Sequence, residues 1–91
     1  MSYIIRFSDE ARNVIAKYKK SNQIAYKKIS RLIAELVEHP REGTGHPEPL
    51  TGGNSTTYSR RISASDRLIY DIYDDIVVVL VLSVGGHYGD K

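Results

Sequence analysis

Hydrophobic and polar positions follow two different periods in the two halves of this chain. In the N-terminal half, apolar side chains recur every three or four positions, which is typical of a helix with one buried face. The clearest stripe consists of Ile29, Leu32, Ile33, Leu36 and Val37. A similar stripe of Ala11, Val14, Ile15 and Tyr18 precedes it. The pattern therefore predicts two helices in succession.

Capping residues define where these helices should begin and end. Ser8 precedes two acidic residues, which is the arrangement of an N-cap followed by a first helical turn. We expect this helix to stop near Lys20, and Ser21 or Asn22 to cap the second. Pro40 ends the second helix, since the residue before a proline avoids helical backbone. The short break between them predicts an antiparallel helical hairpin.

The C-terminal half favours strands instead. The strands expected there are residues 55–63, 66–73 and 76–82, and a further short strand, residues 2–7, is expected before the first helix. Asp74-Asp75 is a turn signal that predicts a two-residue hairpin. Because residues 76–82 are apolar at every position, they predict a central strand buried on both faces. The expected fold is a single α+β domain over residues 1–91, with two N-terminal antiparallel helices packed on a twisted, mostly antiparallel β-sheet.

Composition narrows the possible functions. The 91 residues contain no cysteine, so neither a disulfide nor a thiolate site can form. The longest apolar run, residues 76–82, is far shorter than the roughly 18 residues of a membrane span, and the start has no signal-peptide pattern. We therefore expect a cytoplasmic protein with no membrane partner.

Charge is unevenly distributed, although the net charge is only +2. Residues 1–31 contain eight basic and two acidic residues, a charge of +6, whereas residues 32–91 contain five basic and nine acidic residues, a charge of −4. Such a basic region can attract nucleic acid or an acidic protein. A solvated helix face is the simpler explanation.

Residues 43–50 contain a carboxylate in an unusual setting. Pro47 and Pro49 fix their own φ and restrict the residues before them, so Glu48 is expected in a stiff, extended backbone. Arg60 and Arg61 lie within one expected strand, where their side chains must point to opposite faces. Parity alone does not say which of the two faces the open side of the sheet.

Further polar candidates stand near the ends of the last two strands. Arg67 follows a turn, and His87 and Tyr88 follow a pair of glycines. The three histidines show no metal-ligand spacing, no nucleophile elbow is present, and no glycine-rich loop connects a strand to a helix. We expect no metal and no cofactor.

Together these residue types suit metal-free RNA cleavage. One group takes the proton from a 2′-OH, another protonates the leaving 5′-oxygen, and a cation stabilises charge on the phosphoryl oxygens. A simpler interpretation makes the arginines cross-strand partners of Asp66, Asp71 or Glu48, and leaves the histidine inert.

The chain resembles the YoeB-type toxins of the RelE superfamily, the toxin halves of bacterial toxin–antitoxin pairs. The resemblance covers nearly the whole chain and is densest at residues 43–50, 58–62, 66–70 and 87–88. It implies helices on a twisted sheet and an endoribonuclease that cuts mRNA in the ribosomal A site, leaving 2′,3′-cyclic phosphate and 5′-OH ends.

The resemblance also implies a role for each site residue. Glu48 would be the general base and His87 the general acid, although which of the two is base and which is acid stays open. Arg67 would stabilise the transition state, Arg61 would hold the phosphate, and Tyr88 would position the nucleotide.

The sequence departs from the family pattern at a few positions. His46 and Thr51 stand where lysines are common, and a protonated His46 would supply one phosphate-binding cation. The chain also continues past Tyr88 with Gly89, Asp90 and Lys91.

The implied partners are a YefM/Phd-like antitoxin, the ribosome and mRNA, with operator DNA bound only through the antitoxin; a homodimer is left open. The alternative function is a non-catalytic binder with the same fold, acting as a target-blocking toxin or a transcriptional co-repressor. Such relatives generally lack the Glu, Arg and His-Tyr set, so its presence favours the nuclease.

Overall fold

Side-chain caps begin both helices. The computed structural model describes residues 2–50 and 56–85. Ser8 Oγ accepts a hydrogen bond from the N–H three residues ahead at 3.0 Å and begins α1 (Asp9–Ser21). Asn22 Oδ1 does the same at 3.1 Å and begins α2 (Gln23–Glu38), so Asn22 is the cap that is used. One residue thus separates the helices, as the expected hairpin requires.

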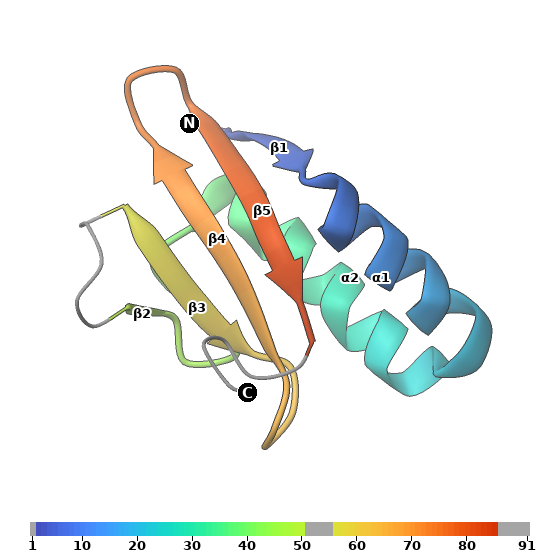
Figure 1. Cartoon of the computed structure of the whole chain (residues 1–91). Coiled ribbons are helices and arrows are strands. Elements are labelled where there is room, and N and C mark those ends of the chain that lie inside the picture. Colours follow the sequence, from blue (N-terminus) through green and yellow to red (C-terminus); the bar gives the residue numbers. More distant parts are fainter. Residues whose placement is uncertain (1, 51–55, 86–91) are drawn as a thin grey trace.

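Five strands form one sheet in the order β1-β5-β4-β3-β2 (Figure 1). The first strand pairs in parallel with the last, and every other neighbouring pair is antiparallel. The predicted α+β class is therefore confirmed. The strands are β1 (Ile4–Phe7), β2 (Glu48–Pro49), β3 (Thr57–Arg61), β4 (Arg67–Tyr73) and β5 (Val78–Val84).

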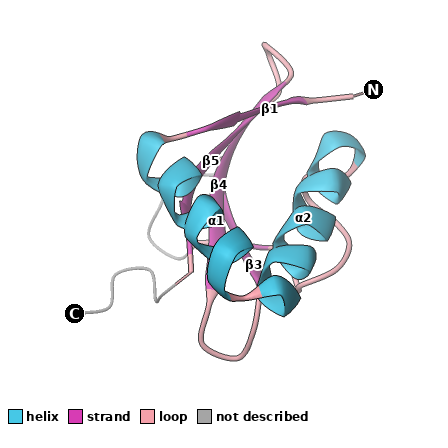
Figure 2. Ribbon diagram, turned by 90° about the vertical axis from the view of Figure 1, so that its right-hand side faces the viewer, coloured by secondary structure: helices cyan, strands magenta, loops and turns pink. Residues whose placement is uncertain are grey.

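Both helices cover the same face of the sheet (Figure 2). We call the opposite face, which the helices leave uncovered, the outer face. The core lies between the helices and the sheet and contains Ala11, Ile29, Leu32, Leu36, Ile62, Leu68, Tyr70, Ile72, Val79, Val81 and Val84.

The last hairpin differs from the prediction. Residues 74–77 form the connection, which is twice as long as the expected two-residue turn, and β5 begins at Val78. Val77 has a positive φ of 55°, and Ile76 is 62% exposed. Turn geometry therefore overrides the apolar character of these two residues, which do not join the strand.

The strand β5 is buried on one face only, whereas burial on both faces had been expected. It lies between β1 and β4, and its residues are alternately buried and half-buried from Val78 to Val81. A register shift in the β4–β5 pairing leaves Leu82 without a partner and returns Val84 to the core. The helices bury one face, and the apolar residues of the other face belong to the outer surface.

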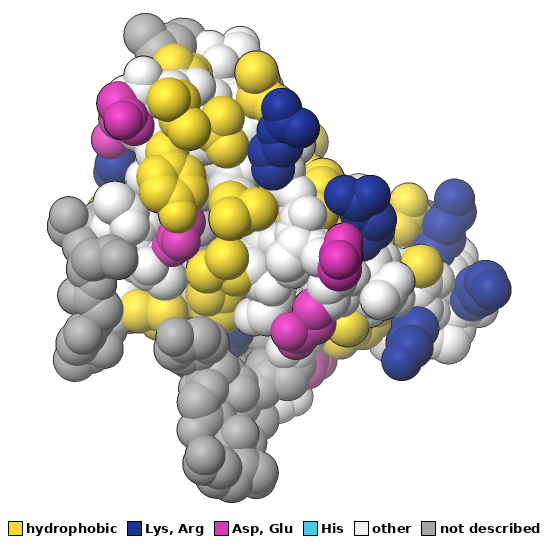
Figure 3. Space-filling view, turned by 45° about the horizontal axis from the view of Figure 1, so that its top comes forward, with side chains coloured by type: hydrophobic (Ala, Val, Ile, Leu, Met, Phe, Trp, Pro, Cys, Tyr) yellow, Lys and Arg dark blue, Asp and Glu magenta, His cyan; other side chains and the backbone are white. Residues whose placement is uncertain are grey.

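Hydrophobic side chains gather on the outer face near the last hairpin, beside basic side chains that lie toward the helices (Figure 3). The register places Ile4 beside Val78 and Arg6 beside Leu80 in this region. Within residues 2–50 and 56–85, no helix is long and apolar enough to cross a bilayer.

We expect Leu32→Ala to lower the free energy of unfolding by about 2–5 kcal/mol, because Leu32 is completely buried between α2 and the sheet. Urea unfolding measures the change. The control Ile24→Ala removes a side chain that is 86% exposed and should change stability by less than about 0.5 kcal/mol. Equal losses in the two variants would contradict this description of the core.

Candidate active site on the outer face of the sheet

The two adjacent arginines of β3 point to opposite sides of the sheet. Arg60 is completely buried, whereas Arg61 is exposed. Tyr58 and Ile62 have the same parity as Arg60 and also pack on the core. Their apolar character was therefore the sequence signal that could have placed Arg60 inside.

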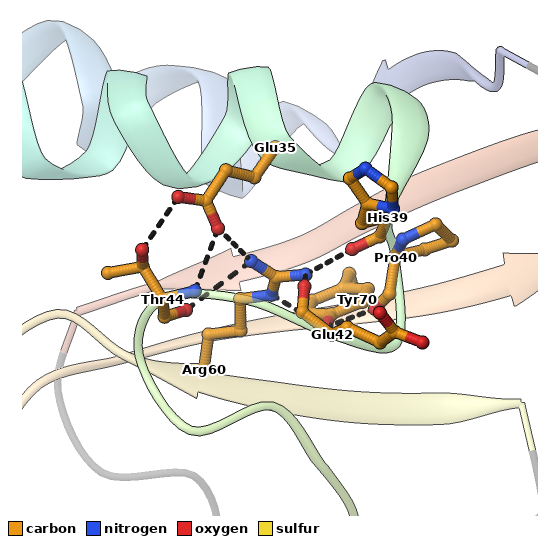
Figure 4. Close-up of polar contacts among 7 residues, drawn as sticks. All are labelled: Glu35, His39, Pro40, Glu42, Thr44, Arg60 and Tyr70. Atoms are coloured by element: carbon orange, nitrogen blue, oxygen red, sulfur yellow. Dashed lines mark hydrogen bonds and ion pairs between the residues drawn. The ribbon is translucent and has the colours of Figure 1, made fainter.

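Arg60 uses all five of its N–H donors inside the protein (Figure 4). Its Nε donates to Tyr70 Oη at 3.1 Å, and one terminal nitrogen donates to Glu35 Oε1 at 2.9 Å. The remaining bonds go to the carbonyl oxygens of His39, Glu42 and Thr44 at 2.5, 2.6 and 3.3 Å. We call Arg60 with its partners the Arg60 clamp. It fixes the loop between α2 and β2 against the sheet.

Two hydroxyl groups extend the Arg60 clamp. Tyr70 Oη donates to the carbonyl oxygen of Pro40 at 2.7 Å, and burial raises the pKa of this phenol. Thr44 donates to Glu35 through its hydroxyl at 2.7 Å and through its N–H at 2.8 Å. These bonds, led by that of the hydroxyl and joined by those of Arg60, outweigh partial burial and lower the pKa of Glu35. Glu35 is therefore held as a carboxylate.

A separate contact ties the same loop to the last hairpin. Arg41 makes a bidentate ion pair with Asp74, at 2.7 and 3.2 Å, and Tyr3 Oη donates to the same carboxylate at 2.7 Å. The Arg41 bonds lower the pKa of Asp74. This pair is largely solvent-exposed, so it contributes less to stability than the buried contacts do.

The loop then turns sharply before β2. Gly45 has a φ of +88°, and its carbonyl oxygen accepts the Arg61 N–H at 2.6 Å. A Cβ on Gly45 would approach the Arg61 carbonyl oxygen to 2.8 Å, so the close backbone contact requires glycine. His46 also has a positive φ, of 52°, and is exposed.

The sheet register brings three of the predicted site residues together on the outer face. Glu48 pairs directly with Ser59, two residues before Arg61, and Arg61 pairs directly with Arg67. Because side chains of paired residues share a face, all three charged groups lie on the side away from the helices. Glu48 and Arg61 form a diagonal pair, for which the spacing is roughly 7–8 Å, and Arg67 lies directly opposite Arg61 on the next strand. This spacing leaves room for a phosphodiester between Glu48 and Arg61.

The floor of this site is uncharged. Ser59 and Ile69 pair with each other below the charged groups, and each is only 1% exposed. No hydrogen bond or ion pair joins Glu48, Arg61 or Arg67 to another side chain within the described residues. The expected alternative, in which Arg61 and Arg67 serve as cross-strand partners of a carboxylate, therefore finds no support in this part of the chain.

Two like charges directly opposite each other destabilise a sheet. Arg61 and Arg67 are placed in this way, and no acidic side chain described here neutralises them. An anion bound between them would remove this repulsion. The arrangement is therefore suited to a phosphate group with a carboxylate next to it.

Some predicted residues lie outside the described residues. These are His87, Tyr88, Thr51 and the tail of Gly89, Asp90 and Lys91. Gly85, the last described residue before His87, donates its N–H to the Arg67 carbonyl oxygen at 2.8 Å. Among the described residues, no group of three or more acidic or histidine side chains could hold a metal ion.

Comparisons with known proteins identify the family. Residues 7–88 match the model of the YoeB-like toxin of bacterial type II toxin–antitoxin systems. The Toxin YoeB of Streptomyces coelicolor is 37% identical over 76 residues, which is 84% of this chain and 90% of that protein. The chain belongs to the YoeB family. It is a toxin of a type II toxin–antitoxin system.

Solved YoeB structures share the fold of this YoeB-family toxin. The YoeB dimer from Staphylococcus aureus matches with a TM-score of 0.83 and 29% identity, covering 97% of this chain and all of that one. The YoeB–YefM complex from the same organism matches with a TM-score of 0.80 and 30% identity over the same shares.

Sequence reasoning missed the partners that hold this site in place. Glu35, Thr44 and Tyr70 were not among the candidate residues, because each bonds to Arg60 across a long separation in sequence. The strand β2 was also missed. Only its extended backbone was predicted, and two residues are too few to give a periodic signal.

The stability of this YoeB-family toxin should fall as pH drops through the folded pKa of Glu35. Folding lowers that pKa below the ordinary glutamate value of about 4.5. Between the folded and the unfolded pKa values of Glu35, the unfolded chain thus binds more protons than the folded one. The stabilisation that is present at higher pH is therefore lost as pH falls. Urea midpoints measured from neutral to acidic pH should decline less steeply in Glu35→Gln. The control Glu42→Gln removes an exposed carboxylate from the loop that follows α2 and should keep the wild-type slope.

Proposed function

We propose that this toxin is a ribosome-dependent endoribonuclease that cleaves mRNA in the ribosomal A site and thereby inhibits translation. The observation that supports it most is the grouping of Glu48, Arg61 and Arg67 on the outer face, with no other use for these charges among the described residues. The sequence adds His87, two residues after Gly85.

The proposed reaction needs one base, one acid and a cationic site for the phosphate. A base, which we assign to Glu48, removes the proton of the 2′-OH. The 2′-oxygen then attacks phosphorus, the bond from phosphorus to the 5′-oxygen breaks, and His87 gives that oxygen a proton. The products are a 2′,3′-cyclic phosphate and a 5′-OH, and no water is consumed in this step.

The two arginines have complementary tasks in this scheme. Charge grows on the non-bridging phosphoryl oxygens as the attack proceeds, and a guanidinium stabilises it best when the donors are already in place. We assign this task to Arg67, and assign the holding of the ground-state phosphate to Arg61, with Tyr88 positioning the nucleotide and His46 as a further phosphate contact. DNA should be inert because it lacks the 2′-OH nucleophile.

The proposed partners follow from the family and from charge. A YefM/Phd-like antitoxin would neutralise this toxin, as the S. aureus YoeB is found in complex with YefM, and operator DNA would be bound only through that antitoxin. A homodimer is proposed by analogy with the S. aureus YoeB dimer. Residues 1–31, with their charge of +6, would face an acidic protein segment or ribosomal RNA, and the site of action would be the cytoplasm.

The decisive experiment maps cleavage positions on a ribosome-bound message. We expect wild type to cut in the A site with chelator present, and Glu48→Ala and His87→Ala each to lower the single-turnover rate by at least about 100-fold, since each removes a proton-transfer group. Glu10→Ala, which removes an exposed carboxylate of α1, is the control.

Two outcomes would reject this mechanism. One is full activity in the double variant Glu48→Ala/His87→Ala, and the other is a strict need for a divalent metal in the chemical step. Inhibition of translation without any cleaved message would instead identify a non-catalytic, target-blocking binder.

Arg67→Lys should also slow cleavage by roughly 10²-fold, because a point charge does not reproduce the planar fork of a guanidinium on a phosphate. Single-turnover rates at saturating ribosome concentration provide the measurement. Arg12→Lys makes the same exchange on the exposed side of α1 and should leave the rate unchanged. A near-normal rate in Arg67→Lys would refute the role in the transition state.

A further inference from the structure

We propose that Arg60 is a positioning residue for Glu48, an inference that rests on the function proposed above. Arg60 is completely buried, on the helix side of the sheet, so it cannot touch a substrate on the outer face. It is nevertheless adjacent in sequence to Arg61, which lies on that face. The pair therefore connects the inside of the fold to the candidate site.

Both residues of this pair hold the loop that leads to Glu48. The Arg60 side chain binds the carbonyl oxygens of His39, Glu42 and Thr44. The Arg61 main-chain N–H binds the next carbonyl oxygen, that of Gly45, at 2.6 Å. Thr44 is four residues before Glu48, so the position of the loop is fixed immediately before the carboxylate.

Few backbone hydrogen bonds within the loop itself hold its shape. Gly43 and Gly45 have positive φ values, and the backbone bond from the Glu42 N–H to the His39 carbonyl oxygen is long, at 3.4 Å. A segment of this kind stays ordered only when its surroundings determine its conformation. The Arg60 clamp provides four of those contacts to main-chain oxygens, counting the Tyr70 bond to the Pro40 carbonyl oxygen.

The strand β2 is too short to place Glu48 by itself. It has only two residues, and Pro49 has no N–H to donate. Glu48 faces Ser59, and the next backbone bond outside the strand runs from the Leu50 N–H to the Thr57 carbonyl oxygen at 3.0 Å. The carboxylate thus depends on the loop before it for its place beside Arg61.

Lysine cannot replace Arg60 in this role. A guanidinium has five donors in one plane, and all five are used here, whereas an ammonium group has three. Arg60→Lys keeps the charge opposite Glu35 and gives up part of the carbonyl contacts. It should therefore loosen the loop without leaving the Glu35 carboxylate unpaired.

The test compares Arg60→Lys with Arg41→Lys on programmed ribosomes. Arg41 lies in the loop that the Arg60 clamp holds, and its guanidinium also pairs with a carboxylate, that of Asp74, but on the surface of the protein. Both variants are assayed at a temperature where urea curves show them folded. For Arg60→Lys we expect the saturated cleavage rate to fall at least about 10-fold while half-saturation moves by less than about 2-fold, because misplacement impairs the chemical step and spares binding. For Arg41→Lys we expect a rate within about 2-fold of wild type.

A double variant asks whether Arg60 acts through Glu48. In a Glu48→Ala background, Arg60→Lys should cause no further loss of rate, because the group it positions has been removed. Amide hydrogen exchange supplies a readout that needs no activity. The N–H groups of Thr44 and Arg61, which bind Glu35 and Gly45, should lose protection in Arg60→Lys and keep it in Arg41→Lys.

The outcomes separate the two proposals. If wild type leaves messages intact, the proposed function fails and takes this inference with it. If wild type cleaves and Arg60→Lys cleaves at the wild-type rate, the positioning role alone is overturned. It is likewise overturned if Arg60→Lys lowers the cleavage rate by the same factor in the Glu48→Ala background as in the wild-type background. The positioning role is also overturned if Arg41→Lys slows cleavage as much as Arg60→Lys does, because general loosening of the loop would then explain the effect of both variants. If Arg60→Lys does not fold, Thr44→Val replaces it in each of these measurements. This variant removes only the hydroxyl bond to Glu35, and we expect it to change the cleavage rate and the amide protection in the same direction.

Discussion

A buried guanidinium organises this small protein. Burying a charge is expensive unless its partners are complete, and Arg60 has a full set: a carboxylate, a phenol and three main-chain oxygens. The same interaction solves a second problem, because an irregular loop carries carbonyl groups that a helix or strand would have satisfied. The charge and the loop therefore stabilise each other. Removing the Glu35 carboxylate would leave the buried guanidinium without a counter-ion, at a cost of about 3–5 kcal/mol.

The sheet separates structural from chemical demands. Its helix-covered face is apolar apart from Arg60 and its partners, and this face accounts for the folding of the chain. Its outer face carries charges that do not help folding, since Arg61 and Arg67 face each other directly. Alternation along a strand makes the separation possible, because consecutive residues such as Arg60 and Arg61 belong to different faces. One dipeptide thus serves both the fold and the candidate site.

Periodic and local signals in the sequence were reliable guides. The stripe through Leu32 and Leu36 identified α2, the cap at Ser8 identified the start of α1, and the residues around Glu48 correctly indicated an extended backbone. The prediction failed where a decision depended on contacts distant in sequence. Ile76 and Val77 lie in the β4–β5 turn despite their strand propensity. No local pattern around Glu35 predicted its bond to Arg60. The grouping of Glu48 with both arginines could be named from family resemblance, but only the register places them on one face.

The parallel pairing of β1 with β5 has a consequence for synthesis of the protein. Ser8 Oγ donates to the Leu82 carbonyl oxygen across 74 positions, and β5 lies between β1 and β4. Such distant pairings form late, because the chain must lose much freedom before they contribute. A nascent chain cannot complete its sheet until Val84 has left the ribosome that makes it. Chains that end before β5 would therefore expose core residues to quality control, and a truncated message would yield a substrate for proteases in place of a smaller toxin.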